Sequence, residues 1–167
     1  MRALIVYYSK TGTNEKLCQE LQKELSCDLE KITDKTDRSG FWKFILSGRD
    51  ALTKKMTEIE PIQKGLEFYD IIIVGTPFWA GSLPPATRTF LAKYKDGIKR
   101  LAVASVSGNG ESNKKVSSDI EAASGKKIQA FLALSDKEYK SGAYQEKFDI
   151  FINAIRTLQK VKGDLHG

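Results

Sequence analysis

The sequence predicts a three-layer, doubly wound α/β fold: a five-stranded parallel sheet with helices on both faces, in a single domain over residues 1–167. Five apolar, β-rich segments alternate along the chain with segments of helical periodicity. The run Ile71-Ile72-Ile73-Val74 has no polar alternation, which is typical of a strand covered on both faces. A length of 167 residues, of which 41% are hydrophobic, suits one globular domain with a buried core.

The first half of the chain opens with an apolar run over residues 3–8, which predicts a strand that ends at a cluster of hydroxyl residues. Leucines that recur at every fourth position predict a helix over residues 13–25: Leu17, Leu21 and Leu25. Residues 27–32 alternate between apolar and polar, which suits a second strand with one buried face or at an edge. A helix over residues 39–56 is then expected to lie on the sheet through four apolar positions: Phe41, Ile45, Leu52 and Met56.

The second half continues the alternation of strands and helices. Further strands are predicted over residues 68–75, 99–107 and 127–134. Helices are predicted after the loop at residues 76–85, then through residues 116–123, and last over residues 141–161. The last helix carries an apolar face made of Phe148, Phe151, Ile152, Ile155 and Leu158.

The net charge of +6 comes from lysines and arginines in small groups, with acidic residues beside them. A nucleic-acid groove needs a basic stripe interleaved with aromatic residues, and the sequence has no such stripe. We therefore expect a solvated surface and no nucleic-acid partner. The alternative is a surface that attracts an acidic protein partner.

Cysteine and histidine are scarce in this chain. Cys18 and Cys27 do not make a disulfide framework, and Cys18 is interpreted as a small buried hydrophobic residue, with a reactive thiol as the alternative. The single histidine, His166, argues against histidine catalysis and zinc chemistry. The first apolar run is too short for a secretory signal, and no segment approaches the ~20 apolar residues of a membrane span. We expect a cytoplasmic protein with no membrane partner.

The loop Ser9-Lys10-Thr11-Gly12-Thr13-Asn14, the hydroxyl loop, joins the first strand to the first helix. The first turn of a helix leaves backbone N–H groups unpaired, and the helix dipole favours negative charge there. Ser and Thr hydroxyl groups add donors, and Gly12 lets the backbone come close to a ligand. The hydroxyl loop therefore predicts a phosphate site.

Two further loops leave apolar strands at the same edge of the predicted sheet. The aromatic loop, residues 76–82, places Phe78 and Trp79 on a rim where side chains do not have to be buried. The alternative interpretation is that both aromatic side chains belong to the core. The glycine loop, residues 107–110, offers backbone amides. Ligands of open α/β sheets lie at the carboxyl ends of the strands. A phosphate end, an aromatic side chain and backbone donors together favour a phosphorylated planar ring as the ligand.

With these motifs the chain resembles the flavodoxin family. That family's phosphate loop runs S/T-x-T-G-x-T directly after the first strand, where the hydroxyl loop stands in this chain. Many members have a second loop of the form G-T-P-x-W, which Gly75-Thr76-Pro77-Phe78-Trp79 matches. Through the order of its elements the resemblance extends over nearly the whole chain. It implies the strand order 2-1-3-4-5 and FMN bound at the strand ends.

The resemblance implies a cofactor site drawn from all three loops, with no catalytic or metal-binding residue demanded. Its members are Ser9, Lys10, Thr11, Gly12, Thr13, Asn14, Thr76, Pro77, Phe78, Trp79, Ala80, Gly81, Ser107, Gly108, Asn109 and Gly110. Hydroxyl and amide groups of the hydroxyl loop would hold the FMN phosphate, with the Asn14 side chain donating in place of the family's last Thr. Lys10 either adds a cation there or points to solvent.

The other two loops would contact the flavin ring. Trp79 would stack on the isoalloxazine, and Phe78 would pack beneath the loop. Backbone groups of Ala80 and Gly81 would meet the reactive edge of the ring. The glycine loop would bond the pyrimidine edge.

The chain departs from the family at two points. Residues 111–114 lack the second stacking aromatic that many flavodoxins carry, so one flavin face is open or is covered by another element. Trp42 is a candidate for that cover or for a partner contact, and a helix-packing residue is the alternative. The net positive charge is the second departure, because electron-carrier flavodoxins are mostly acidic.

Three functions remain open at this point. The first is an FMN electron carrier, a monomer or homodimer that works with a redox partner protein of acidic surface. Stacking of the flavin ring in a poorly hydrated site would separate the two one-electron steps of its reduction. The second is an FMN-dependent oxidoreductase that takes hydride from NAD(P)H and reduces a quinone or similar small acceptor, favoured by an open flavin face and a basic rim. The third is a non-redox binding or regulatory module. A receiver domain is disfavoured because the first strand lacks the acidic pair that binds magnesium.

Overall fold

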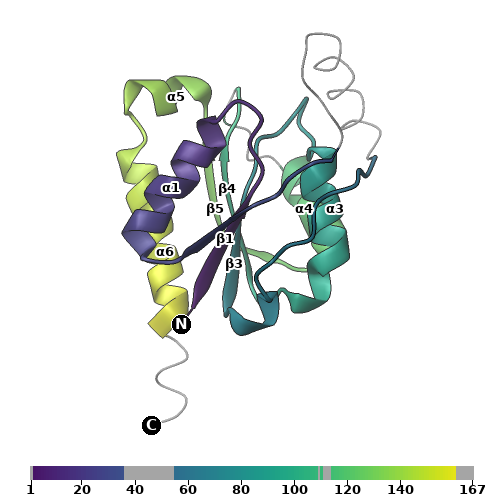
Figure 1. The fold of residues 1–167 in the computed structure, drawn as a ribbon. Coiled ribbons are helices and arrows are strands. Elements are labelled where there is room, and N and C mark those ends of the chain that lie inside the picture. Colours follow the sequence, from purple (N-terminus) through teal and green to yellow (C-terminus); the bar gives the residue numbers. More distant parts are fainter. Residues whose placement is uncertain (1, 36–54, 109, 111–113, 161–167) are drawn as a thin grey trace.

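The computed structural model describes residues 2–35, 55–108, 110 and 114–160, and the structural statements below concern these residues. Their strands form one sheet in the order β2-β1-β3-β4-β5 (Figure 1). The strands are β1 (Ala3–Tyr7), β2 (Asp28–Lys31), β3 (Ile71–Gly75), β4 (Leu101–Val106) and β5 (Ile128–Leu134). Every neighbouring pair is parallel. Order and direction confirm the predicted doubly wound α/β sheet.

Helices cover both faces of this sheet and give three layers (Figure 1). α1 (Thr13–Leu25) and α6 (Gln145–Lys160) lie on one face, and α3 (Pro85–Tyr94) and α4 (Lys114–Ser124) lie on the other. A short helix, α5 (Asp136–Ser141), stands between β5 and α6. Two 3-10 turns, η1 (Leu66–Phe68) and η2 (Lys95–Gly97), precede β3 and β4.

Side chains of β1 alternate between two hydrophobic cores. Leu4 and Val6 pack in the core beneath α3 and α4, whereas Ile5 and Tyr7 pack in the core beneath α1 and α6. Every residue of β1, β3 and β4 is buried, as expected of strands covered on both faces. β2 lies at the edge of the sheet and has no fully buried residue, in agreement with its alternating sequence.

The predicted last helix, over residues 141–161, corresponds to α6, which begins at Gln145, and a separate short helix that was not predicted, α5, precedes it. Ser135 caps α5: its hydroxyl accepts from Glu138 N, and the Glu138 carboxylate accepts from Ser135 N at 2.7 Å. Gly142, with φ +76°, ends α5 before α6 begins at Gln145. The predicted apolar face of α6 is confirmed, because Phe148, Phe151, Ile152 and Ile155 are buried and Leu158 packs against them.

Residues 36–54 lie outside the described part of the chain, together with Trp42 and most of the helix predicted over residues 39–56. Met56 was expected on the buried face of that helix. This expectation is wrong, because Met56 is 59% exposed and lies in no helix. The neighbouring Thr57 is tied to α3 by two hydrogen bonds with Thr89, one from its N–H at 3.0 Å and one to its carbonyl at 2.9 Å.

No helix in the described ranges has both the length and the apolar character that crossing a membrane requires. Within the same ranges, no three His, Cys, Asp or Glu side chains come together in a way that would hold a metal ion.

Gly75, the last residue of β3, lies in close contact with α1. A Cβ atom on Gly75 would lie 2.1 Å from Cys18 Sγ and 3.0 Å from Tyr7 Cβ. Cys18 is fully buried, and this burial raises the pKa of its thiol. Cys18 is therefore the buried hydrophobic residue that its position predicted. The absence of a side chain at Gly75 lets α1 approach the sheet.

We expect Gly75→Ala to lower the free energy of unfolding by about 1–3 kcal/mol, because the added methyl group forces core side chains to shift. Cys18→Ala removes the sulfur that the methyl group would meet, so the double variant should recover part of this loss. Urea denaturation of both variants and of Cys18→Ala alone measures the coupling. A single variant as stable as the wild type would contradict the close contact.

Candidate functional site

The three loops meet around one cavity at the carboxyl edge of the sheet. The hydroxyl loop follows β1, the aromatic loop follows β3 and the glycine loop follows β4, and these three strands are adjacent. The cavity has a volume of about 300 Å³. Its walls are formed by Ser9, Lys10, Thr11, Thr13, Asn14, Pro77, Phe78, Trp79, Val106, Ser107, Gly108 and Asp136.

The hydroxyl loop is shaped by its own hydrogen bonds. Gly12 is the N-cap residue of α1 and has φ +86°, a conformation that favours glycine. Its N–H donates to Ser9 Oγ at 3.1 Å, and its carbonyl accepts from Lys16 N at 3.0 Å. The hydroxyl oxygens of Thr11 and Thr13 lie 3.4 Å apart. Hydroxyl groups therefore gather in front of the first turn of α1, where the helix dipole favours an anion.

The Lys10 side chain points inward and not to solvent. Its Nζ is shielded from solvent and lies 5.9 Å from the centre of the Trp79 ring. The ammonium group thus adds positive potential where the hydroxyl loop and the aromatic loop face each other.

Asn14 is bound to β4. Its Nδ2 donates to the carbonyl of Val106 at 2.9 Å, and Val106 N donates to Asn14 Oδ1 at 2.8 Å. The side chain is only 4% exposed. The sequence predicted that this amide would donate to a phosphate. In the structure the amide joins the first turn of α1 to the end of β4, and so holds the hydroxyl loop beside the glycine loop, while Asn14 also lines the cavity.

Asn14→Leu is expected to lower the free energy of unfolding by about 1–3 kcal/mol for each Val106 backbone group left without a partner. Asn14→Asp keeps the acceptor for Val106 N but sets a carboxylate oxygen against Val106 O, so its loss should be smaller at low pH, where the protonated carboxyl can donate, than at neutral pH. Urea denaturation gives the two values, and amide hydrogen exchange at Val106 shows whether the loss is local. Protection of that amide in Asn14→Leu at the wild-type level would contradict the role given to Asn14.

The two aromatic residues of the aromatic loop have different environments. Phe78 is buried; its ring makes an edge contact with Phe131, at 6.1 Å between centroids, and its N–H donates to Ser107 Oγ at 2.7 Å. It packs beneath the loop, as expected. Trp79 is only partly buried and meets the ring of Tyr8 edge to face at 5.8 Å. Both side chains line the cavity, but Phe78 is also part of the buried core, whereas Trp79 is only partly buried.

Trp79 begins a tight turn that ends at Ser82. Trp79 N donates to Ser82 O at 2.9 Å, and Ser82 N donates to Trp79 O at 3.0 Å. The two central residues, Ala80 and Gly81, have φ of +50° and +70°, as in a type I′ turn. For alanine this conformation costs on the order of 1 kcal/mol. The turn is therefore held in place by its surroundings.

The glycine loop packs against the start of α5. Gly110 has φ +67°, and its N–H donates to Ser107 O at 2.7 Å. A Cβ atom on Gly110 would lie 2.8 Å from Ser135 N, so a side chain does not fit there. Gly108 is exposed, and a Cβ atom on it would meet nothing within 4 Å. Asn109 lies outside the described residues.

Most of the predicted site residues line the cavity, and the described exceptions are Gly12, Thr76, Ala80, Gly81 and Gly110. Thr76 is fully buried, and its hydroxyl shares a hydrogen bond with Thr87 Oγ1 at 2.8 Å, so it supports the aromatic loop from below.

Sequence reasoning missed Val106 and Asp136 in the cavity wall, and Tyr8 beside Trp79. Asp136 stands just after β5. The rule that ligands gather at the carboxyl ends of strands, applied to the fifth strand as well, would have indicated Asp136. No pattern in the sequence pointed to the other two residues.

The charged side chains in the wall of the cavity are Lys10 and Asp136. Glu15 lies in the first turn of α1 but belongs to another cluster, because its carboxylate accepts from Tyr7 OH at 2.8 Å and from Lys31 Nζ at 3.4 Å. The hydrogen bond from Tyr7 lowers the pKa of Glu15, and burial together with Glu15 raises the pKa of Tyr7. Glu15 therefore stays ionised behind the hydroxyl loop.

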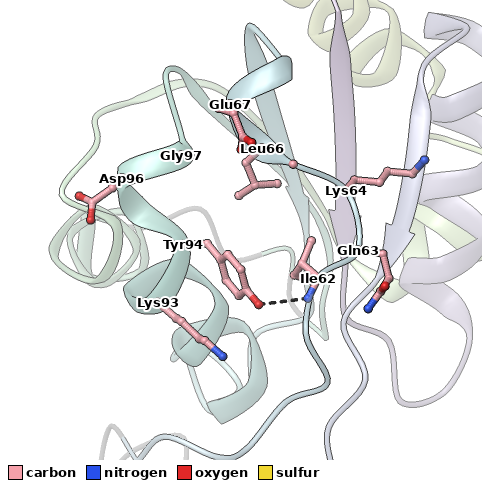
Figure 2. Close-up of a pocket in the computed structure, with 10 residues that line it drawn as sticks. Ile62, Gln63, Lys64, Leu66, Glu67, Lys93, Tyr94, Asp96 and Gly97 are labelled. Atoms are coloured by element: carbon pink, nitrogen blue, oxygen red, sulfur yellow. Dashed lines mark hydrogen bonds between the residues drawn. The ribbon is translucent and has the colours of Figure 1, made fainter.

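A second cavity of about 300 Å³ lies at the opposite edge of the sheet, beside the turns that precede β3 and β4 (Figure 2). Several of its polar side chains are engaged with the protein. Tyr94 OH accepts from Ile62 N at 3.0 Å, and Gln63 Nε2 donates to Pro61 O at 2.9 Å. Lys64 extends away from the cavity toward Asp28, 3.9 Å away. The cavity between the three loops is therefore the better candidate site.

Comparison with known proteins shows the fold. No protein-family model matches the chain, and no curated protein is similar to it in sequence. A flavoprotein from Lactobacillus acidophilus NCFM, solved in complex with FMN, superposes with a TM-score of 0.68 at 21% identity, over 84% of this chain and 97% of that one. The apo form of the flavoprotein from the same organism superposes with a TM-score of 0.60 at 22% identity, over 83% of this chain and 95% of that one. Oxidised flavodoxin 1 from Bacillus cereus superposes with a TM-score of 0.54 at 17% identity, over 93% of this chain and 98% of that one. The chain therefore has the flavodoxin-like fold that its sequence predicted.

Proposed function

We propose that this chain of flavodoxin-like fold binds FMN between its three loops and serves as an electron carrier. The observation that carries the proposal is one cavity that is lined by both the hydroxyl loop and Trp79. The Lactobacillus acidophilus flavoprotein, which was solved with FMN, supports the proposal through its similar fold.

The residues present fit the two ends of FMN. At the phosphate end we assign Ser9, Thr11, Thr13 and the backbone of Gly12, with the Lys10 ammonium to offset the phosphate charge. Asn14 holds that loop to Val106, and the second N–H of its Nδ2 would donate to the phosphate.

At the ring end we assign Trp79 for stacking, with Thr76, Pro77 and Phe78 supporting it. The backbone of Ala80 and Gly81 would lie at the reactive edge of the ring. Ser107, Gly108, Asn109 and Gly110 would lie at the pyrimidine edge. FMN when bound supplies electron and hydride chemistry, and the chain positions the ring and limits its contact with water.

The partner in this proposal is a redox protein with an acidic surface. Three exposed lysines, Lys16, Lys115 and Lys137, lie in the first turns of α1, α4 and α5. These turns follow β1, β4 and β5, so they stand at the carboxyl edge of the sheet, as the cavity does. Glu15 in the first turn of α1, and Asp136 and Glu138 in that of α5, are acidic, so the edge carries both signs of charge. The three lysines would attract an acidic partner at their own positions, and added salt would weaken that effect.

An FMN-dependent NAD(P)H oxidoreductase that acts on a quinone or similar small acceptor is the second candidate. The same three lysines favour it, because the phosphates of a nicotinamide nucleotide also seek cations. With either function we propose a cytoplasmic location and a monomer or homodimer, which light scattering after size-exclusion chromatography would distinguish.

Titration of the purified chain with FMN, followed by flavin fluorescence, tests the proposal. We expect one FMN to bind per chain and to colour the protein yellow. Tyr94→Phe, in the second cavity, is the matched control and should bind as the wild type does. A protein that is colourless after FMN is added and unbound FMN is removed by gel filtration would refute both candidate functions.

Reduction of the loaded protein separates the two candidates. Stepwise reduction that resolves two one-electron potentials supports the carrier, and rapid bleaching by NADPH alone supports the oxidoreductase. Reoxidation by ferricyanide should slow as salt is added, and reoxidation by hexaamminecobalt(III) should not, if the three lysines govern the potential at this edge. The opposite order would contradict their attraction for an acidic partner.

A further inference from the structure

A buried ion pair lies directly behind the turn that carries Trp79. Arg88 of α3 binds Asp119 of α4 through both ends of its guanidinium: Nη1 donates to Oδ1 at 2.9 Å and Nη2 donates to Oδ2 at 2.7 Å. Arg88 is 7% exposed and Asp119 is 6% exposed. The two helices lie side by side on the same face of the sheet (Figure 1).

The pair is bonded to the last residue of the turn and to the residue after it. Ser82 Oγ donates to Asp119 Oδ2 at 3.1 Å and accepts from Arg88 Nη2 at 3.2 Å. Leu83 N reaches the same carboxylate oxygen at 3.5 Å. The far end of the Trp79–Ser82 turn is therefore attached to two helices at once, while its near end carries the Trp79 side chain into the cavity.

Stability alone does not account for such a pair. Apolar residues of similar volume often replace a buried ion pair with no loss of stability, because they avoid desolvating two charges. Here the guanidinium also leaves its Nε buried without a hydrogen-bond partner among the described residues, which adds a further cost. Apolar residues, however, offer no hydrogen bonds to Ser82 and Leu83. What the pair supplies beyond packing is the position of the turn.

We infer that Arg88 and Asp119 are positioning residues for the flavin site: through Ser82 they hold the strained Trp79–Ser82 turn, and with it the Trp79 ring, in the geometry that receives a planar ligand. Neither residue lines the cavity, so they act through the turn. The strain at Ala80 fits this role, because a left-handed alanine persists only where neighbouring contacts hold it. The inference rests on the proposed FMN binding for its ligand and on the structure for its geometry.

The test follows the Trp79 ring in the absence of FMN. In a Trp42→Phe background, Trp79 is the one tryptophan left in the chain, so its fluorescence reports the aromatic loop. The double variant Arg88→Met/Asp119→Leu removes the pair without leaving a lone buried charge. Ser82→Ala removes only the link to the turn. Ser124→Ala, the matched control, deletes the hydroxyl of a different buried serine, which lies in α4 and donates to Ile120 O.

We expect the double variant and Ser82→Ala to remain folded, to shift the Trp79 emission to longer wavelength and to expose it to acrylamide quenching. FMN affinity should fall about tenfold or more in both, as expected when a preorganised site loosens, and should stay unchanged in Ser124→Ala. Folded variants with the emission and FMN affinity of the parent would overturn the inference. If the parent itself does not bind FMN, the proposed function fails, while the emission comparison still decides whether the pair holds the turn.

Discussion

Arg88→Met alone is expected to lower the free energy of unfolding by about 3–5 kcal/mol, the usual loss when one partner of a buried ion pair is removed. The variant leaves the Asp119 carboxylate buried beside Ser82 without its guanidinium. Arg88→Met/Asp119→Leu should recover most of this loss, because no charge is then left behind. Urea denaturation at neutral pH measures all three chains. A double variant no more stable than the single one would show that the charges themselves stabilise the fold.

The loss should also depend on pH. Burial works to raise the pKa of Asp119, but the hydrogen bonds and charge of Arg88 outweigh it and lower the pKa from 3.8 to about 2. A folded-state pKa below the unfolded one gives stability that is present above pH 3.8 and disappears as the pH falls through about 2. The difference between wild type and Arg88→Met should therefore shrink on acidification across this window. A difference that grows there would contradict the assigned ionisation.

Trp79→Ala is expected to weaken FMN binding about 10- to 100-fold, since stacking of a planar heteroaromatic ring on an aromatic side chain is worth about 1–3 kcal/mol. Trp79→Phe keeps an aromatic face and should lose less. Because Trp79 is only partly buried, both variants should remain folded. Fluorescence titration with FMN gives the dissociation constants. Wild-type affinity in Trp79→Ala would remove Trp79 from the proposed site and leave the hydroxyl loop as an anion site without a ring-binding wall.

Strands and long helices could be predicted because each has a local pattern. The run before Gly75 has no polar residue and reads as a central strand, and α1 appears in the spacing of its leucines. The break at Gly142 was missed because the apolar spacing of α6 was extended backward over it, although Ser135 and Glu138 form a capping box that marks a separate helix start.

The candidate site was predictable in outline because loops after neighbouring parallel strands must meet at one edge. Its internal hydrogen bonds were not. Asn14 and Val106 lie 92 residues apart, and Arg88 and Asp119 lie 31 apart on different helices. Helical periodicity shows which face of a helix is apolar, but it says nothing about which polar side chain of another element lies opposite. Such pairs become visible only once the helices are placed on the sheet.

The hydrogen bonds between Asn14 and Val106, and the one from Phe78 N–H to Ser107 Oγ, link the three loops to one another without any ligand. The conformational entropy of the three loops is therefore lost when the chain folds, and ligand binding does not have to order these loops again. A ligand of the proposed site would meet loops that are already linked to one another, so we expect a planar ring to bind without breaking these hydrogen bonds. We therefore expect the amide hydrogen exchange of the three loops to change little between the empty and the loaded protein.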